Sequence, residues 1–126
     1  MSDSSYEIAL PWPPSANASW RCVSGRTLLT SRARTYRSTV KKLVAINRPP
    51  AAIREAQLAV ELRASAPDRR RRDIDNIAKQ ILDALGHAGV YDDDSQIDRL
   101  TISRLHPGTG SVLVQIDDLE CEPCRV

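Results

Sequence analysis

The chain has 126 residues, of which 41% are hydrophobic and 27% are charged, with a formal net charge of +2. This length fits one domain, so we expect residues 1–126 to form a single domain, and the balance of apolar and charged residues excludes a disordered chain. No apolar run approaches the roughly 20 residues of a membrane-spanning helix, so no membrane partner is expected.

The small net charge conceals an uneven distribution. Between Trp20 and Arg72 there are 14 Lys and Arg residues against three acidic ones, and from Asp73 to Val126 there are four against 11. A strongly basic half indicates a surface for a polyanion such as nucleic acid. The alternative, that the arginines only keep the protein soluble, stays open at this level.

The cysteines indicate a reducing compartment, because their number is odd and no charged-then-apolar leader precedes the chain, which favours the cytoplasm over secretion. The terminal CEPC contributes one pair, Cys121 and Cys124. A zinc site would need two more ligands, so this pair alone does not predict one.

The N-terminal third is expected to contain strands around a rigid loop. Residues 6–10 (YEIAL) have the apolar run of a short strand, and the prolines of PWPPSANASWR exclude a helix after it. GRTLLTS is expected to form a second strand or a turn.

Residues 31–46 (SRARTYRSTVKKLVAI) predict a helix with Ser31 as its cap. Apolar residues recur at helical spacing on one face, and Lys and Arg occupy the other. The apolar positions are Ala33, Tyr36, Val40, Leu43 and Val44.

The second half continues the alternation of strands and helices. Residues 57–65 alternate like a half-buried strand, and a helix after the arginines presents the stripe Ile74, Ile77, Ile81 and Leu85, with Gly86 as its stop. RLTISRL and SVLVQI predict two strands joined as a hairpin by HPGTG. The predicted order β-β-α-β-α-β-β indicates an α/β (α+β) domain with a mixed sheet and two main helices.

The most unusual stretch is DRRRRDIDN, residues 68–76, in which four arginines precede two aspartates. Residues i and i+2 of an extended backbone point to one side, so Asp73 and Asp75 can converge on one ion. Lys79 lies one helical turn beyond Asp75 on the same face. Arginines beside clustered carboxylates offset their mutual repulsion and can grip phosphate.

A third acidic cluster, Asp92, Asp93 and Asp94, follows about 20 residues later. The intervening chain is long enough to bring it back to the first two aspartates, although length alone does not establish this. Oxygen ligands without nearby His or Cys suit Mg²⁺ or Mn²⁺. An EF-hand is excluded, because a loop from Asp92 would place Ile97 where Gly is required.

The residues alone also permit a purely structural interpretation. Asp73 and Asp75 would cap a helix, Lys79 would pair with one of them, and Asp92–Asp94 would form a solvated turn.

PDRRRRDIDNIAKQILDALGHAGVYDDDSQID resembles the signature of the RusA-type Holliday junction resolvases, and LPWPPSANASWR resembles the opening segment of that family. The two blocks cover about a third of the chain in the family's order. The long block is specific: it contains D-x-D-N, a Lys four residues after the second Asp, then D-A-L, Gly and an Asp pair.

The resemblance implies roles for particular residues. The three catalytic, metal-binding carboxylates of the family correspond to Asp73, Asp75 and Asp94, and its required lysine corresponds to Lys79. The DNA-binding arginine before D-x-D corresponds to Arg72, and with the charge pattern we expect Arg69, Arg70 and Arg71 to bind DNA as well. Asn17 and Arg21 match the N-terminal motif and are also expected at the DNA.

The sequence departs from the family pattern at two places. Leu82 stands where an aromatic residue is expected before D-A-L. Asp92 adds an acid to the usual pair, so Asp93 could exchange roles with Asp94. Asp83 is interpreted as structural, since it lies two turns from Asp75.

The implied function is an Mg²⁺-dependent endodeoxyribonuclease that resolves Holliday junctions by paired symmetric nicks in DNA recombination and repair. The resemblance further implies a homodimer acting on branched DNA in the bacterial cytoplasm, without a small-molecule cofactor. The small basic chain also fits a phage or prophage origin. Two other functions stay open: a branched-DNA-binding protein with little cleavage, and a metal-binding or interaction module without activity.

Overall fold

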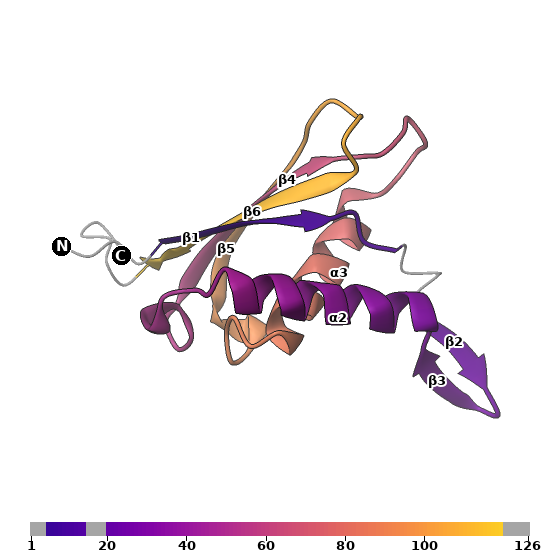
Figure 1. The fold of residues 1–126 in the computed structure, drawn as a ribbon, viewed down its shortest axis with the longest axis horizontal. Coiled ribbons are helices and arrows are strands. Elements are labelled where there is room, and N and C mark those ends of the chain that lie inside the picture. Colours follow the sequence, from indigo (N-terminus) through magenta and orange to yellow (C-terminus); the bar gives the residue numbers. More distant parts are fainter. Residues whose placement is uncertain (1–4, 15–19, 120–126) are drawn as a thin grey trace.

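The computed structural model describes residues 5–14 and 20–119, and between residues 20 and 29 it describes few side chains. Four strands form one mixed sheet in the order β1-β6-β4-β5 (Figure 1). Strand β4 lies inside the sheet, antiparallel to β6 and parallel to β5, while β1 pairs antiparallel with β6. These strands are β1 (Ser5–Pro11), β4 (Leu58–Ser65), β5 (Ile97–Arg104) and β6 (Ser111–Asp118).

Helices α2 (Ser31–Ile46) and α3 (Ile74–His87) cover one face of this sheet, and the core lies between the layers (Figure 1). In β1 the residues Tyr6, Ile8 and Leu10 are buried while their neighbours are exposed, so the predicted short strand is confirmed and one of its faces packs against the core. The opposite face is polar: Glu7, Gln115 and Glu61 lie side by side across three strands.

Helix α2 has the predicted bounds and the predicted buried face. Its cap differs by one residue: Thr30, rather than Ser31, is the N-cap, and its hydroxyl oxygen accepts the Ala33 N–H at 3.3 Å. The extended backbone of Thr30 aims its side chain at the first free amides of the helix, as an N-cap requires.

Helix α3 buries Ile77, Ile81 and Leu85 as predicted, but it does not stop at Gly86. It continues to His87, and Gly86 serves close packing instead: a Cβ at this position would lie 3.3 Å from Cε1 of Tyr91. The buried Tyr91 hydroxyl donates to the carbonyl of Leu82, which fixes the chain just after the helix.

The predicted order of strands and helices is confirmed, with one strand added. Strand β2 (Trp20–Val23) pairs with β3 (Arg26–Leu29) in a separate two-stranded sheet. The predicted N-terminal loop therefore ends before Trp20.

The predicted hairpin between the last two strands is wrong, because β4 lies between β5 and β6. Residues 105–110 cross the end of β4 instead, where Leu105 N–H donates to the Ala64 carbonyl (2.8 Å) and Gly108 N–H to that of Ala66 (2.7 Å). Alternation reports which face of a strand is buried but not which strand lies beside it.

The crossover from β4 through α3 to β5 positions the acidic segments. Residues 66–73 follow the end of β4, whereas residues 88–96 precede β5 at the other end of α3 (Figure 1). The Trp12 N–H donates to the Gly110 carbonyl at 3.0 Å, which holds the segment after β1 at the same end of the sheet as residues 66–73. Among the described residues, no helix is long and apolar enough to cross a bilayer. Cys121 and Cys124 lie outside the described residues.

Candidate functional site

Asp73 and Asp75 stand free at the N-terminus of α3. Asp73 is the N-cap residue by backbone position, yet its side chain makes no capping hydrogen bond, and Asp75 lies exposed in the first turn. Neither carboxylate has a hydrogen-bond or ion-pair partner in the described part of the chain. The capping interpretation of these residues is therefore not what the structure shows.

Lys79 lies one turn further along the same helix. Its Nζ is 3.9 Å from Oδ2 of Asp83, and its side chain is 67% exposed. The structural interpretation paired Lys79 with Asp73 or Asp75, but the described structure has a loose pairing with Asp83 instead. Such an exposed ion pair is weak, so the ammonium group is available to a ligand near Asp75.

Asp68 organises the segment that precedes these carboxylates, which we call the arginine loop (residues 68–72). Its Oδ1 accepts the Arg70 N–H at 2.9 Å and lies 2.8 Å from Nη2 of Arg72. The Arg70 N–H, and then the Arg72 guanidinium, lower the pKa of Asp68 below its ordinary value. One carboxylate therefore holds the turn in which the four arginines are presented.

Arg72 is the most enclosed member of the arginine loop, with 22% of its side chain exposed. Its guanidinium donates to the carbonyls of Asp68 and Arg70 at 3.3 Å each and lies over the Trp12 ring, 5.4 Å from the centroid. Arg104 from β5 donates to the Arg72 carbonyl at 2.8 Å. Arg72 thus joins three segments, and its structural contacts occupy much of the group expected to bind DNA.

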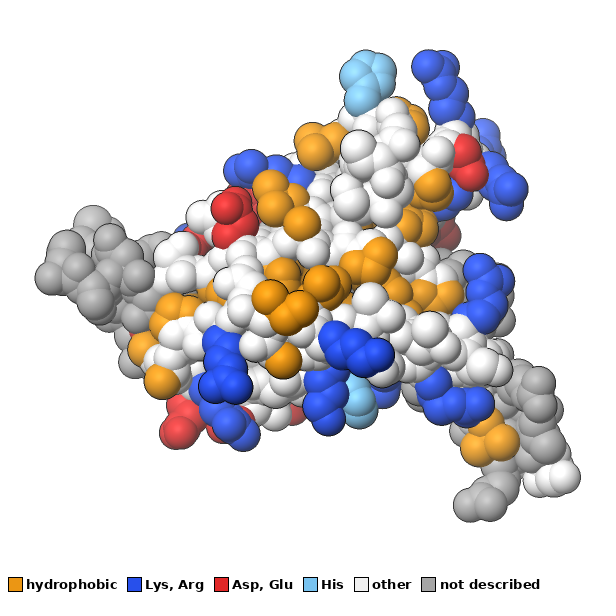
Figure 2. Space-filling view, in the orientation of Figure 1, with side chains coloured by type: hydrophobic (Ala, Val, Ile, Leu, Met, Phe, Trp, Pro, Cys, Tyr) orange, Lys and Arg blue, Asp and Glu red, His pale blue; other side chains and the backbone are white. Residues whose placement is uncertain are grey.

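The other three arginines of the loop, Arg69, Arg70 and Arg71, are exposed. Lys and Arg side chains also appear over α2 in the space-filling view (Figure 2), and Arg32 of α2 lines the same pocket as Arg70, Arg71 and Arg72. The structure therefore brings the two basic segments of the sequence to one side. Of the N-terminal residues expected at the DNA, Asn17 lies outside the described residues, and Arg21 is described only as part of the backbone of β2.

The three aspartates of the third cluster have different partners. Asp92 is paired with Arg54, whose Nε lies 2.8 Å from its Oδ1. Asp93 accepts hydrogen bonds from the backbone and hydroxyl of Ser95, which lower the pKa of its carboxyl group. Asp94 alone has a side chain without a partner in the described part of the chain. This distinguishes Asp94 from Asp93 as the carboxylate available to a metal.

Gln96 holds this segment in place and was not singled out in the sequence. Its side-chain oxygen accepts the N–H groups of Asp92 and Asp93 at 2.9 Å each, and its Nε2 donates to the carbonyls of Arg54 and Ala56. The result is a capping box on the short helix η2 (Asp94–Gln96). A Gln three residues after an Asp is the sequence signal of this motif.

The structure keeps Asp94 apart from Asp73 and Asp75 within one chain. Burial raises the pKa of the Tyr91 hydroxyl, and the negative charges of Asp94 and Asp83 raise it further. Asp94 is therefore near Tyr91 and Asp83, which belong to the C-terminal half of α3 and the segment just after it. The 14 residues of α3 separate the two ends by about 21 Å. Among the described residues, no three His, Cys, Asp or Glu side chains lie close enough to share a metal ion. The expected convergence therefore does not occur within one described chain.

Comparison with known proteins gives a consistent result. The family described as Endodeoxyribonuclease RusA matches residues 11–117. The crossover junction endodeoxyribonuclease rusA of Enterobacteria phage HK97 is 35% identical over 117 residues, which cover 91% of this chain and 96% of that protein. The RusA protein of Escherichia coli strain K12, also named a crossover junction endodeoxyribonuclease, is 38% identical over 96 residues, with 73% and 76% covered.

The bonds around Asp68 lead to a prediction about the arginine loop. Asp68→Asn removes the charge that attracts Arg72 and weakens acceptance of the Arg70 N–H, so we expect faster amide hydrogen exchange at residues 69–72. The measurement is hydrogen exchange followed by NMR or mass spectrometry. Glu61→Gln is the matched control, because it weakens an exposed pair with Arg63 (3.3 Å) on the other face of the sheet. Unchanged exchange in Asp68→Asn would contradict the role given to Asp68.

Proposed function

Because this chain belongs to the Endodeoxyribonuclease RusA family, we propose that it is a metal-dependent endonuclease that resolves Holliday junctions by paired, symmetric nicks. The related proteins come from bacteria and their phages, so its proposed place of action is the bacterial cytoplasm, in DNA recombination and repair.

The observation that carries this proposal is the pair of unpartnered carboxylates beside exposed arginines. Asp73 and Asp75 begin α3, and Arg71 lies two residues before Asp73. Carboxylate oxygens without nitrogen or sulfur ligands fit Mg²⁺, and Mn²⁺ as its substitute. When bound, such an ion polarises a phosphodiester and supplies an activated water for in-line attack.

The chain's own residues would bind and position the DNA around that centre. Arg69, Arg70 and Arg71 extend into solvent and can hold phosphates on either side of the bond to be cut. The Lys79 side chain can rotate away from Asp83 towards a phosphate bound beside Asp73 and Asp75. Its ammonium group can then stabilise the negative charge that develops on that phosphate in the transition state. The arginines also offset the repulsion between the phosphate backbone and the two aspartates.

The separation of Asp94 from Asp73 and Asp75 supports a homodimer as the active form. If Asp94 of a second copy approaches the N-terminus of α3, each site combines carboxylates from both chains, and two equivalent sites result. Strand β5 forms an edge of the sheet with exposed Leu100 (40%), a surface that a second copy can cover. Two symmetric sites match the two strands of like polarity in a four-way junction.

A branched-DNA-binding protein with little cleavage is the second candidate, favoured by the basic surface over α2 and the arginine loop (Figure 2). Binding alone does not explain Asp73 and Asp75, since free carboxylates at a phosphate surface repel the ligand. A nuclease needs basic side chains to bind the DNA and acidic side chains to bind the metal ion, so we prefer nuclease activity to binding alone.

The central test compares a synthetic four-way junction with linear duplex, in Mg²⁺ and in EDTA. We expect paired nicks in the junction alone, none in EDTA, and a loss of more than about 100-fold in Asp75→Asn, since a metal ligand is removed. Asp75→Asn should still bind the junction in a gel-shift assay. Glu7→Gln, on the opposite face of the sheet, should cut normally. Junction binding by the wild type without nicking would leave only the second candidate.

The basic surface predicts a steep dependence of junction affinity on salt, because each phosphate contact releases counterions. Arg71→Ala should reduce the slope of log Kd against log salt concentration by about one. Arg63→Ala is the control, as Arg63 lies on the other sheet face and pairs with Glu61. Equal slopes for the wild type and Arg71→Ala would place Arg71 away from the DNA.

The composite site predicts complementation between inactive variants. A heterodimer of Asp75→Asn and Asp94→Asn chains has one site with both changes and one site with neither, so mixing should restore nicking of one junction strand. Mixing Asp73→Asn with Asp75→Asn should restore nothing, because each site then keeps one altered residue. If the first mixture stays inactive after subunit exchange is confirmed by mass spectrometry, the site is not shared in this way.

A further inference from the structure

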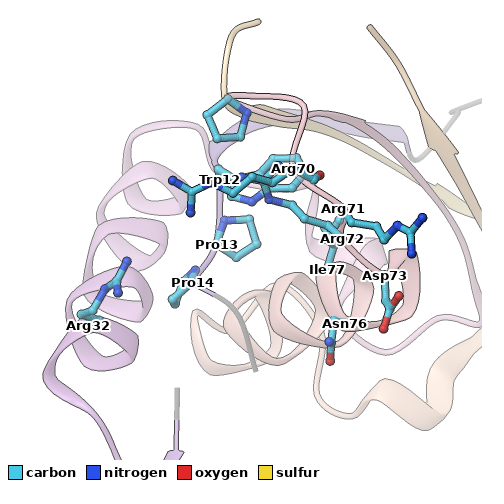
Figure 3. Close-up of a pocket in the computed structure, with 11 residues that line it drawn as sticks. Trp12, Pro13, Pro14, Arg32, Arg70, Arg71, Arg72, Asp73, Asn76 and Ile77 are labelled. Atoms are coloured by element: carbon cyan, nitrogen blue, oxygen red, sulfur yellow. Dashed lines mark hydrogen bonds between the residues drawn. The ribbon is translucent and has the colours of Figure 1, made fainter. Parts of the chain in front are cut away.

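A cleft lies between α2 and α3 beside Asp73, and the proposed metal chemistry does not use it. Its volume is about 600 Å³, within the range of about 300–1,000 Å³ typical of small-molecule sites. Trp12, Pro13 and Pro14 lie between the helices, with Arg32 of α2 on one side and Asn76 of α3 on the other (Figure 3).

The apolar part of the cleft consists of one Trp and three Pro side chains, and it is held in place. Trp12 is fixed by its backbone hydrogen bond to Gly110 and by the guanidinium of Arg72 over its ring. Pro13 is buried, and Pro67 lines the cleft from the start of the arginine loop. Proline backbones have little freedom to lose, so a ligand meets a largely pre-formed surface.

The polar groups of the cleft are arginines, the Asp73 carboxylate at its edge and one amide, that of Asn76. Arg32 and Arg70 are exposed at its edge. The exposed Asn76 side chain has no hydrogen-bond partner in the described part of the chain. An amide offers a donor and an acceptor side by side, which complements the edge of a nucleobase.

We propose that this cleft receives one unstacked nucleobase of the bound DNA, from the strand whose phosphate lies at Asp73. The base stacks against the Trp12 and proline surfaces, Asn76 contacts its edge, and Arg32 and Arg70 hold the flanking phosphates. This inference rests on the proposed function, and it makes Asn76 a specificity-determining residue rather than a catalytic one.

The composition of the cleft favours a base over a phosphate alone. A phosphate-binding site needs donors and positive charge but gains nothing from a Trp and three prolines. Stacking on an aromatic side chain, by contrast, is available to every base and is worth about tenfold or more in affinity. The bases at the exchange point of a four-way junction are also less costly to unstack than those inside a duplex.

The test measures coupling between Trp12 and a single base. Junctions carrying one abasic site, moved stepwise past the exchange point, are titrated with the wild type and with Trp12→Ala in EDTA to prevent cleavage. In the wild type we expect one position at which loss of the base weakens Kd by about tenfold. In Trp12→Ala the same abasic site should weaken Kd by less than about twofold, because the aromatic ring on which the base stacks is already absent. Trp12→Phe should restore most of the difference.

Asn76→Ala provides a second variant that does not disturb the core, as its side chain is exposed. With junctions that carry each of the four bases at the sensitive position, the wild type should discriminate among them in Kd, and Asn76→Ala should reduce that discrimination. Ser38→Ala, exposed on α2 and outside the cleft, is the matched control. Circular dichroism checks that each variant is folded.

The outcomes separate this inference from the function on which it rests. If the wild type binds and cuts junctions but no base is coupled to Trp12, or Asn76→Ala discriminates among bases as the wild type does, the cleft does not hold a base. If the wild type fails to bind junctions at all, the proposed function and this inference both fail.

Discussion

The rigid length of α3 is the constraint on which the arrangement of acidic residues depends. Its buried stripe, Ile77, Ile81 and Leu85, fixes the helix against the sheet, so neither end can move towards the other. Asp73 and Asp75 are therefore held at one end and Asp94 at the other. In the proposed homodimer this separation makes activity depend on assembly. A single chain supplies Asp73 and Asp75 to one site and Asp94 to the other, so neither site is complete without the second chain.

Charge at the arginine loop is divided between folding and the proposed binding of DNA. Asp68 and Arg72 hold the loop through one ion pair and several hydrogen bonds, while the neighbouring arginines keep their guanidinium groups in solvent. Free arginines next to Asp73 and Asp75 lower the electrostatic cost of placing two carboxylates near each other and near a phosphate backbone. The four consecutive arginines thus have two tasks, although the sequence presents them as equivalent.

Local periodicity explains how much of the fold the sequence could predict. The spacing of apolar residues predicted α2, α3, β1 and β4, because each buries one face against the core. The neighbours of β5 and β6 could not be predicted this way, since a loop of six residues can close a hairpin or cross an intervening strand. Chain length likewise set only an upper limit on the reach of Asp94, and the packing of α3 determined its actual place.

The candidate site shows the same limit at the level of single residues. Asp92, Asp93 and Asp94 are identical and adjacent in sequence. A long-range ion pair with Arg54 engages Asp92 and local hydrogen bonds with Ser95 engage Asp93, so in the described part of the chain only the Asp94 side chain has no partner. The family resemblance identified Asp73, Asp75 and Asp94 as candidate metal ligands by their positions in the motif. The hydrogen bonds of Asp93 supply a physical reason for preferring Asp94 to Asp93 as the third candidate.

Arg72 connects the proposed base-binding cleft with the proposed metal site. Its side chain covers Trp12, its guanidinium is bonded to Asp68, and the next residue along the chain is Asp73. A ligand that displaces Arg72 from the Trp12 ring must also disturb the Asp68 contacts that hold the arginine loop. In the proposed complex, contact of the DNA with Trp12 would therefore be coupled through Arg72 to the segment that carries Asp73.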